Sequence, residues 1–178
     1  MILLTGASAS GKTEVAKTLR EEFHIVKAVT CTTRPMRKGE VDGRDYFFLT
    51  KEEFLKRKEE GFFVETTYYN GNYYGCGKDQ IAPNRVVVVD PTGLKNFQAL
   101  HIPGIVSFLL TASEKIRIQR MLHRGDKRNN IAQRIIYDRK EFKHVPHTTY
   151  VIKTDDLNLE QVAKLVLELY QKALQKLN

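Results

Sequence analysis

The chain has 178 residues, of which 42% are hydrophobic and 28% charged, and its formal net charge is +8. This length fits a single domain with its own core, and the composition excludes a disordered, collagen-like or coiled-coil chain. The apolar run at residues 86–89 is far shorter than the roughly 20 residues that cross a bilayer, so no membrane partner is expected. Met1 opens directly into an apolar run without a basic leader, which predicts a cytoplasmic protein.

Hydrophobic periodicity predicts an α/β fold. The apolar run Ile2–Thr5 is typical of a strand that ends in a glycine-rich turn, and residues 13–23 carry apolar positions at helical spacing. Further buried strands are expected at residues 25–29, 85–89, 105–110 and 150–152. Alternation of this kind indicates a mostly parallel sheet with helices on both faces.

Two segments interrupt the alternation. Residues 31–78 are rich in Thr, Tyr, Phe and Gly, and Asn70-Gly71 is a hairpin signal, so a small, mainly β insertion is expected there. Within it, residues 51–60 should form a helix with Thr50 as N-cap and Glu53 completing a capping box. Residues 120–139 are too polar and basic for a core and are expected to form a mobile helical lid. The core of the single domain 1–178 is then formed by residues 1–30, 79–119 and 140–178.

The turn after the first strand has the pattern G-x-x-x-x-G-K-[ST] of the phosphate-binding P-loop. Its glycines let backbone N–H groups and a helix N-terminus face a phosphate, while Lys12 reaches the β- and γ-phosphates and the Thr13 hydroxyl takes a Mg²⁺ position. The predicted ATP-binding residues of the loop are Gly6, Ala7, Ser8, Ala9, Ser10, Gly11, Lys12 and Thr13. GTPases, ATPases and small-molecule kinases share this loop, so other residues must identify the acceptor.

The acceptor signal follows the second predicted strand. The run TTRPMRKGE at residues 32–40, followed by DGRDYFF at 42–48, resembles the signature of the guanylate kinase family, as do GFFVE at 61–65 and NYYG at 72–75. With the P-loop and the lid-like segment, this resemblance covers nearly the whole chain. It implies a single guanylate kinase-like domain that transfers a phosphoryl group from ATP to GMP, and to dGMP, with residues 31–78 as the GMP-binding insertion.

The resemblance implies a GMP site made of Thr30, Arg34, Arg37, Tyr46, Glu65, Tyr74, Cys76 and Asp90. Two guanidinium groups suit a dianionic monophosphate, and the two tyrosine hydroxyls can donate to the same oxygens. Glu65 stands at the end of an apolar run and can accept from the N1 and 2-amino groups of guanine. The alternative interpretation is that Glu65 is a solvated surface carboxylate. Asp90 ends the strand at 85–89, where it can contact guanine, bind Mg²⁺ through water, or simply cap a helix.

The predicted catalytic residues are Lys12, Arg37, Arg124 and Arg134. The resemblance implies that the lid arginines, Arg120 among them, close over the phosphates. The alternative interpretation is that these arginines form a solvated basic helix face. Positive charge around the transferring group supplies much of the catalysis in phosphoryl transfer, with Mg²⁺ bridging the β and γ oxygens. A phosphate dianion is already nucleophilic, so no general base is expected.

Some positions depart from the family pattern. Cys76 replaces a Thr or Ser hydroxyl that contacts guanine O6, and a thiol is a weaker donor. Residues 78–86 form a short segment with Pro83, so the family's helix is expected to shrink to a turn. Thr154 and Asp155 replace an Asn-Asp pair near the adenine and complete the predicted ATP site.

Two alternatives remain open at this point. Another small P-loop kinase, such as a ribose bisphosphate kinase, would keep the phosphate loop without the guanine contacts. A non-catalytic guanylate kinase-like module would bind proteins, but such modules commonly lose residues like Lys12 or the lid arginines. The positive charge fits a polyphosphate pocket better than a nucleic-acid surface, because aromatic and basic residues do not alternate. ATP and GMP are therefore the expected partners, with no nucleic acid and no obligatory protein partner.

Overall fold

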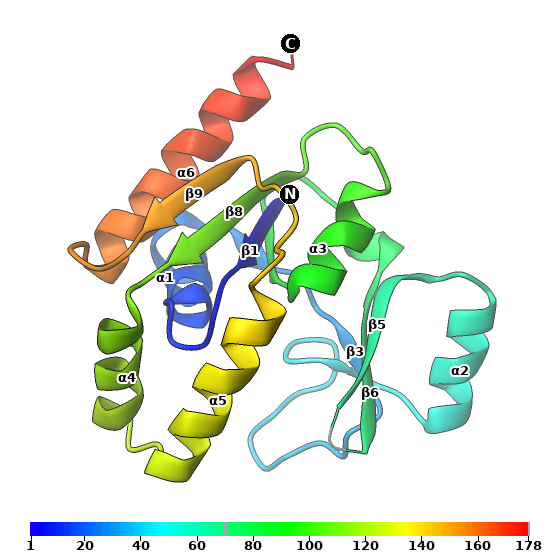
Figure 1. The fold of residues 1–178 in the computed structure, drawn as a ribbon. Helices are drawn as coiled ribbons and strands as arrows, with labels where there is room; N and C mark the ends of the chain where they lie inside the picture. The colour runs from blue at the N-terminus through cyan, green and yellow to red at the C-terminus, as the bar shows by residue number, and fades with distance from the viewer. Residues whose placement is uncertain (70, 178) are drawn as a thin grey trace.

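The computed structural model describes residues 1–69 and 71–177. Within these residues the chain forms a five-stranded sheet and a smaller four-stranded sheet (Figure 1). The strands of the larger sheet, in spatial order, are β2 (Val26–Lys27), β7 (Arg85–Val88), β1 (Ile2–Thr5), β8 (Val106–Thr111) and β9 (Tyr150–Lys153). All neighbouring strands are parallel, which confirms the predicted α/β class.

The larger sheet is covered by helices on both faces, because alternate side chains of β1 point to opposite sides. Ile2 and Leu4 pack in one cluster with α1 (Lys12–Phe23) and α6 (Leu159–Gln175). Leu3 packs in a second cluster with α3 (Pro91–Gln98) on the other face (Figure 1). This arrangement confirms the predicted sheet with helices on both faces.

The smaller sheet lies within the segment 31–77. In spatial order it contains β4 (Phe47–Phe48), β3 (Cys31–Thr32), β6 (Asn72–Gly77) and β5 (Phe63–Tyr69). α2 (Lys51–Glu59) packs on it through Phe54, whose ring stacks on Phe63 with centroids 4.5 Å apart. The capping box between Thr50 and Glu53 is present as predicted. Asn70, half of the predicted turn signal, lies outside the described residues.

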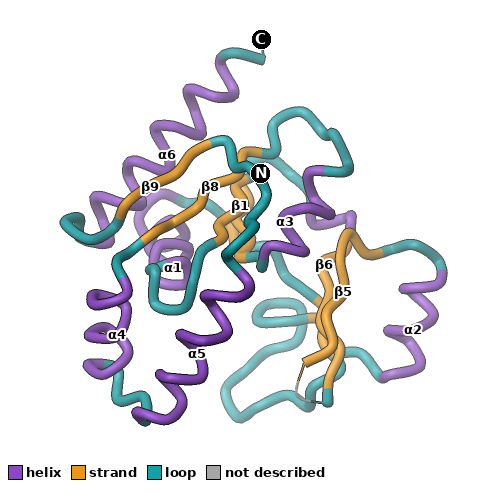
Figure 2. The backbone as a smooth tube through the Cα atoms, in the orientation of Figure 1, coloured by secondary structure: helices purple, strands orange, loops and turns teal. Residues whose placement is uncertain are grey.

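After β8 the chain forms two adjacent helices, α4 (Glu114–His123) and α5 (Arg128–Glu141) (Figure 2). Met121, Ile131 and Ile135 are buried in one cluster that also contacts Ala9 of the P-loop. The prediction that residues 120–139 are too polar for a core is therefore wrong for Met121, Ile131 and Ile135. That these residues move as a lid stays a prediction.

Two of the predicted buried strands lie at the sheet edges. The strand predicted at 25–29 is reduced to the two residues of β2, and Val26 is 55% exposed. In β9, Val151 is 64% exposed. The expected burial is wrong for these side chains, because periodicity does not reveal which strands lack a neighbour. The helix loss predicted near Pro83 is confirmed, since only a 3₁₀ turn, η1 (Lys78–Gln80), remains there.

Candidate functional site

The P-loop joins β1 to α1 and is shaped by its two glycines. Gly6 has φ +149°, and a Cβ there would lie 2.2 Å from the carbonyl oxygen of Leu110, so only glycine lets the chain leave β1 this close to β8. Gly11 precedes α1 with φ +101°. The N–H groups in the first turn of α1 have no helix carbonyl to bond, so the loop surrounds an electropositive helix end. This geometry forms an anion site.

Three successive carbonyl groups of the P-loop are held by side chains from α4 and from the end of β9. The Ser8 carbonyl accepts from Arg117 at 3.3 Å, and the Ala9 carbonyl accepts from Arg120 at 3.2 Å. The Ser10 carbonyl accepts from the Thr154 hydroxyl at 3.2 Å. These bonds turn the three carbonyls away from the anion site, while the Ser8 N–H bonds to Asp138 and the Ser10 N–H bonds to the Ala7 carbonyl. The loop conformation is therefore fixed by tertiary contacts as well as by its glycines.

Lys12 begins α1 and folds back over the loop. Its Nζ donates to the carbonyls of Gly6 at 2.6 Å and Ala7 at 2.9 Å. Burial lowers the pKa of its ammonium group to about 8, and the nearby Asp138 carboxylate opposes this shift. Phosphate oxygens placed in the loop would supply the negative charge that the two carbonyls lack.

Thr154 and Asp155 follow β9 and lie next to the loop. Thr154 is 2% exposed and accepts from Arg120 at its hydroxyl (3.1 Å) and at its carbonyl (2.7 Å). Asp155 accepts from the Ser113 N–H at 2.9 Å, and hydrogen bonds from Ser113 lower its pKa. The Thr154 side chain thus supports the P-loop from within, and contact of these two residues with ATP stays a prediction.

Four of the predicted phosphate anchors gather on the smaller sheet. The Arg34 guanidinium lies 5.5 Å from the ring centroid of Tyr46, and that ring lies 6.3 Å from the ring of Tyr74. Arg34 also donates to Glu40 at 2.7 Å, and the second Glu40 oxygen accepts from the backbone N–H of Arg37 at 2.7 Å. The Arg37 side chain is exposed, and it opposes, after Arg34, the rise in the Tyr46 pKa that burial causes. The cluster is cationic, with Glu40 as its counter-ion.

Glu65 and Asp90 lie together where the smaller sheet meets α3. Glu65 Oε1 accepts from the backbone N–H of Cys76 at 3.1 Å, and Asp90 caps α3 by accepting from the Gly93 N–H at 2.7 Å. Burial, followed by the charge of Asp90, raises the pKa of Glu65 to about 7. Glu65 is therefore not the solvated surface carboxylate of the alternative interpretation, whereas the capping interpretation of Asp90 is confirmed.

Cys76 and Thr30 complete the predicted acceptor residues. Cys76 is fully buried in the apolar cluster that contains Leu94, and its Sγ lies 3.8 Å from the Gly77 carbonyl oxygen. Burial raises the pKa of its thiol to about 12. The structure therefore does not place the Cys76 thiol on the acceptor surface, although its N–H reaches Glu65. Thr30 is half-buried, and its carbonyl oxygen pairs with β4.

The arginines of α4 and α5 divide into two groups. Arg124 caps the end of α4, is 57% exposed and pairs with Asp126. Arg134 on α5 is also exposed, and it helps to lower the pKa of Asp126 after the larger effect of the hydrogen bond from Arg124. Arg120 instead bonds the P-loop and Thr154, so in this structure it supports the loop rather than lying with the other predicted lid arginines.

Two residues at the P-loop were missed by the sequence reasoning. Arg117 and Asp138 form an ion pair at 2.6 Å, with side chains only 8% and 4% exposed, and both contact Ser8. Each shares a helix face with buried apolar residues, Arg117 four positions before Met121 and Asp138 three after Ile135. A charged residue one turn from buried apolar positions on each helix was the available signal, because such charges are seldom buried without a partner.

Thr13 and Asp90 supply the oxygen atoms predicted for Mg²⁺. Thr13 is exposed in the first turn of α1, and Asp90 follows the carboxyl end of β7. Magnesium in phosphoryl-transfer sites takes one or two protein oxygens, with nucleotide phosphates and water filling the remaining positions. Among the described residues no group of three or more His, Cys, Asp and Glu could hold a metal by itself. This donor set fits an ion carried mainly by the phosphates of a nucleotide.

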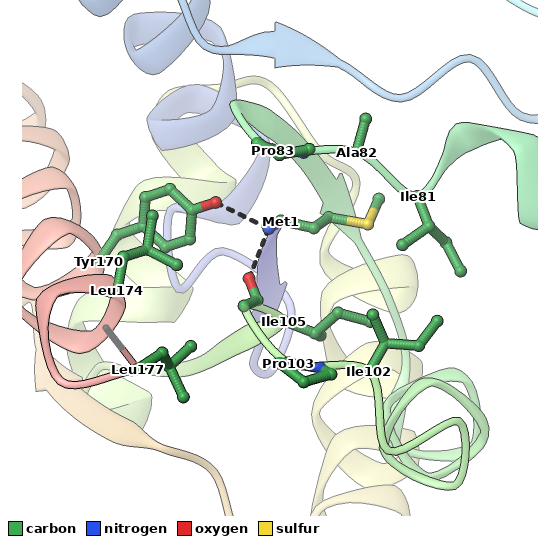
Figure 3. A pocket seen from close by; sticks show the side chains of 11 residues that line it. Met1, Ile81, Ala82, Pro83, Ile102, Pro103, Ile105, Tyr170, Leu174 and Leu177 are labelled. Atoms are coloured by element: carbon green, nitrogen blue, oxygen red, sulfur yellow. Dashed lines mark hydrogen bonds between the residues drawn. The ribbon is translucent and has the colours of Figure 1, made fainter.

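A separate hollow lies at the other end of β1, beside Met1 (Figure 3). Its volume of about 460 Å³ is in the range of small-molecule sites. The Met1 ammonium group donates there to Tyr170 Oη at 2.7 Å and to the Gly104 carbonyl at 2.6 Å. Among the described residues that line it, none has a Lys, Arg, Asp or Glu side chain.

Comparisons with known proteins agree with this geometry. The family model described as guanylate kinase matches residues 1–171. The chain is 34% identical to the guanylate kinase of Wolinella succinogenes over 99% of this chain and 85% of that protein, and 34% identical to that of Synechocystis sp. over 94% and 93%. The crystal structure of guanylate kinase from Anaplasma phagocytophilum superposes with a TM-score of 0.70 at 26% identity, covering 97% of this chain and 84% of that one. No described helix is both long and apolar enough to cross a membrane.

Proposed function

Since the chain belongs to the guanylate kinase family and is a guanylate kinase that phosphorylates GMP with ATP, we propose that the P-loop holds ATP and the smaller sheet holds GMP. The reaction class follows from the family, whereas the roles of single residues are our assignment. The two alternatives left open by the sequence, another small P-loop kinase and a non-catalytic module, gain no support from these relatives.

The donor site is the P-loop, residues 6–13, with Lys12 as its cation. In the free protein the ammonium group already lies over the loop, bonded to the Gly6 and Ala7 carbonyls. Phosphates that enter the loop would meet the N–H groups of α1 from one side and this ammonium group from the other. Binding in this way places positive charge where negative charge develops during transfer.

The acceptor site is the cationic cluster beside the Glu65 carboxylate. Arg34, Arg37, Tyr46 and Tyr74 would bind the phosphate of GMP, with the Arg34 fork exchanging Glu40 for a phosphate oxygen. Glu65 would accept from the N1 and 2-amino groups of guanine. A 2′-hydroxyl plays no part in these contacts, so dGMP is also proposed as a substrate.

Catalysis is assigned to charge and alignment. Lys12, Arg37, Arg124 and Arg134 would surround the transferring group, and the acceptor phosphate attacks in line without a general base. The Thr13 hydroxyl and, through water, Asp90 would hold Mg²⁺, and the ion would supply positive charge that offsets the charge of the nucleotide phosphates. Arg124 must leave Asp126 to reach the phosphates, and we also propose that the distance between residues 31–78 and residues 120–139 shortens when both nucleotides are bound.

The observation that carries the acceptor assignment is the position of Glu65, which is half-buried and held by the Cys76 N–H on the same small sheet that carries Tyr74. A coupled assay of ADP release with ATP and Mg²⁺ tests it against GMP, dGMP, AMP, UMP and CMP. We expect turnover with the two guanine nucleotides only. Equal turnover with AMP would remove Glu65 from guanine recognition. We place the enzyme in the cytoplasm, where its two buried free thiols would stay reduced.

A further inference from the structure

A buried ion pair binds the P-loop to α5. Asp138 on α5 accepts from the Ser8 N–H at 3.0 Å and from the Ser8 hydroxyl at 3.1 Å. Arg117 on α4 donates to Asp138 at 2.6 Å and to the Ser8 carbonyl at 3.3 Å. All three polar groups of Ser8 are thus bonded to this pair.

The Arg117–Asp138 pair is unusual because both of its side chains are charged and buried. Both side chains are less than a tenth exposed. Replacing a buried ion pair by apolar residues of similar size is often neutral or stabilising, so stability alone does not account for the pair. Its position does suggest a purpose, since Ser8 lies in the middle of the loop assigned to ATP.

The Arg117–Asp138 pair also fixes the position of Arg134 relative to the P-loop. Ile131, Arg134, Ile135 and Asp138 form one stripe of α5, at i, i+3, i+4 and i+7. Two of these side chains are buried in the cluster that contacts Ala9, and Asp138 is bonded to Ser8. Arg134, one turn before Asp138, is therefore held at a fixed offset from the loop.

We propose that Arg117 and Asp138 are positioning residues for phosphoryl transfer, which join the P-loop and the Arg134 helix into one unit. The inference rests on the proposed function, because it takes the P-loop as the ATP site and Arg134 as a catalytic residue. Without the pair, the Ser8 carbonyl would lose its hydrogen bond, and the position of Arg134 relative to the P-loop would no longer be fixed. A misplacement of about 1 Å can cost ~100-fold in rate, so the effect should appear in kinetics rather than in folding.

The test compares two double variants. Arg117→Met with Asp138→Leu removes the charges and keeps the volume, and the matched control is Glu114→Gln with Arg139→Gln. The control pair also joins α4 to α5, at 2.7 Å, but it is exposed. For the first variant we expect an unchanged or higher Tm, a loss of about tenfold or more in kcat/KM for ATP, and an unchanged KM for GMP. The control should match the wild type in all of these.

A second readout does not depend on activity. Amide hydrogen exchange at Ser8 should be fast in the Met/Leu variant and slow in the wild type and the control. Should the Met/Leu variant fail to fold, Asp138→Asn is measured below its own Tm, with the same kinetic loss expected. Wild-type kcat and KM for ATP in the folded variants, whatever their Tm, would overturn the positioning role. A wild-type enzyme that does not phosphorylate GMP with ATP would instead overturn the proposed function.

Discussion

Glu65 of β5 and Asp90, the N-cap of α3, approach each other at the N-terminus of that helix. A Cβ built on Gly93 would lie 3.4 Å from Asp90 Oδ1 and 3.6 Å from Glu65 Cγ. A negative charge at Asp90 disfavours ionisation of the half-buried Glu65 carboxyl. Burial and the Asp90 charge accordingly raise the pKa of Glu65 to about 7.

GMP affinity should therefore depend on pH. Below pH 7 the Glu65 carboxyl in the free enzyme is protonated and lacks the charge that guanine N1 and N2 donors prefer, so affinity should rise as the pH rises through about 7. Titration calorimetry of GMP between pH 5.5 and 8.5 measures this. The GMP phosphate also titrates in this range, with a pKa of about 6. The Glu65→Gln variant keeps the effect of the phosphate on GMP affinity but should lose the rise in affinity near pH 7. Identical curves of affinity against pH for the wild type and the variant would contradict the role of Glu65 in guanine binding.

Lys12→Ala should abolish most turnover without unfolding the chain. It removes the ammonium group aimed at the phosphates, and the loss of one hydrogen-bond donor that stabilises a transition state typically costs about 100- to 1,000-fold in kcat. Tm should change little, because Lys12 bonds only carbonyls of the loop in the free protein and its charge is poorly solvated. Lys17→Ala, an exposed change on the same helix, is the control. A Lys12 variant with normal rate and normal melting would disprove the donor-site mechanism.

Arg37→Ala should weaken GMP binding and lower kcat together. Its side chain is exposed beside the Arg34 cluster, where it can reach an acceptor phosphate and hold it in attack geometry. Arg44→Ala is matched to it, since Arg44 is exposed in the same segment and pairs with Asp45. Steady-state kinetics in both substrates distinguish the two. If both variants behave alike, the acceptor phosphate binds elsewhere.

Cys76→Ala should leave the KM for GMP unchanged. The thiol is fully buried among apolar side chains, and the group that reaches Glu65 is the backbone N–H, which alanine keeps. The loss of buried sulfur should lower the free energy of unfolding by about 1 kcal/mol. Urea unfolding and GMP kinetics measure the two effects. A large rise in the KM for GMP would show that the thiol contacts guanine in the bound state.

The approach of residues 31–78 to residues 120–139 should need both nucleotides. Cationic side chains such as Arg37 and Arg124 repel one another across an empty phosphate site, and bound phosphates supply the charge that draws them together. Spin labels on Lys38→Cys and Lys127→Cys, both exposed positions, report the distance between the two segments. We expect the shortest distance with ATP and GMP analogues together. The same distance in the free, singly bound and doubly bound enzyme would exclude closure.

The sequence determined the features that depend on short stretches of chain. The P-loop was predictable from eight consecutive residues, because the spacing of its glycines, Lys12 and Thr13 is a local pattern between a strand and a helix. The capping box of α2 and the turn near Pro83 were predicted for the same reason. The cationic acceptor cluster was also predictable, since Arg34, Arg37 and Tyr46 belong to one motif within 13 residues.

Only the tertiary structure decided which side chains meet across the chain. Arg117 and Asp138 are 21 positions apart and join because α4 and α5 pack side by side, which no local pattern encodes. Glu65 acquires its raised pKa from burial and from Asp90, which is 25 residues away at the N-cap of α3. Cys76 turns into the core because the pairing register of β6 decides which alternate side chains face α3. Electrostatics and access at the site depend on such long-range packing, so they had to be read from the folded chain.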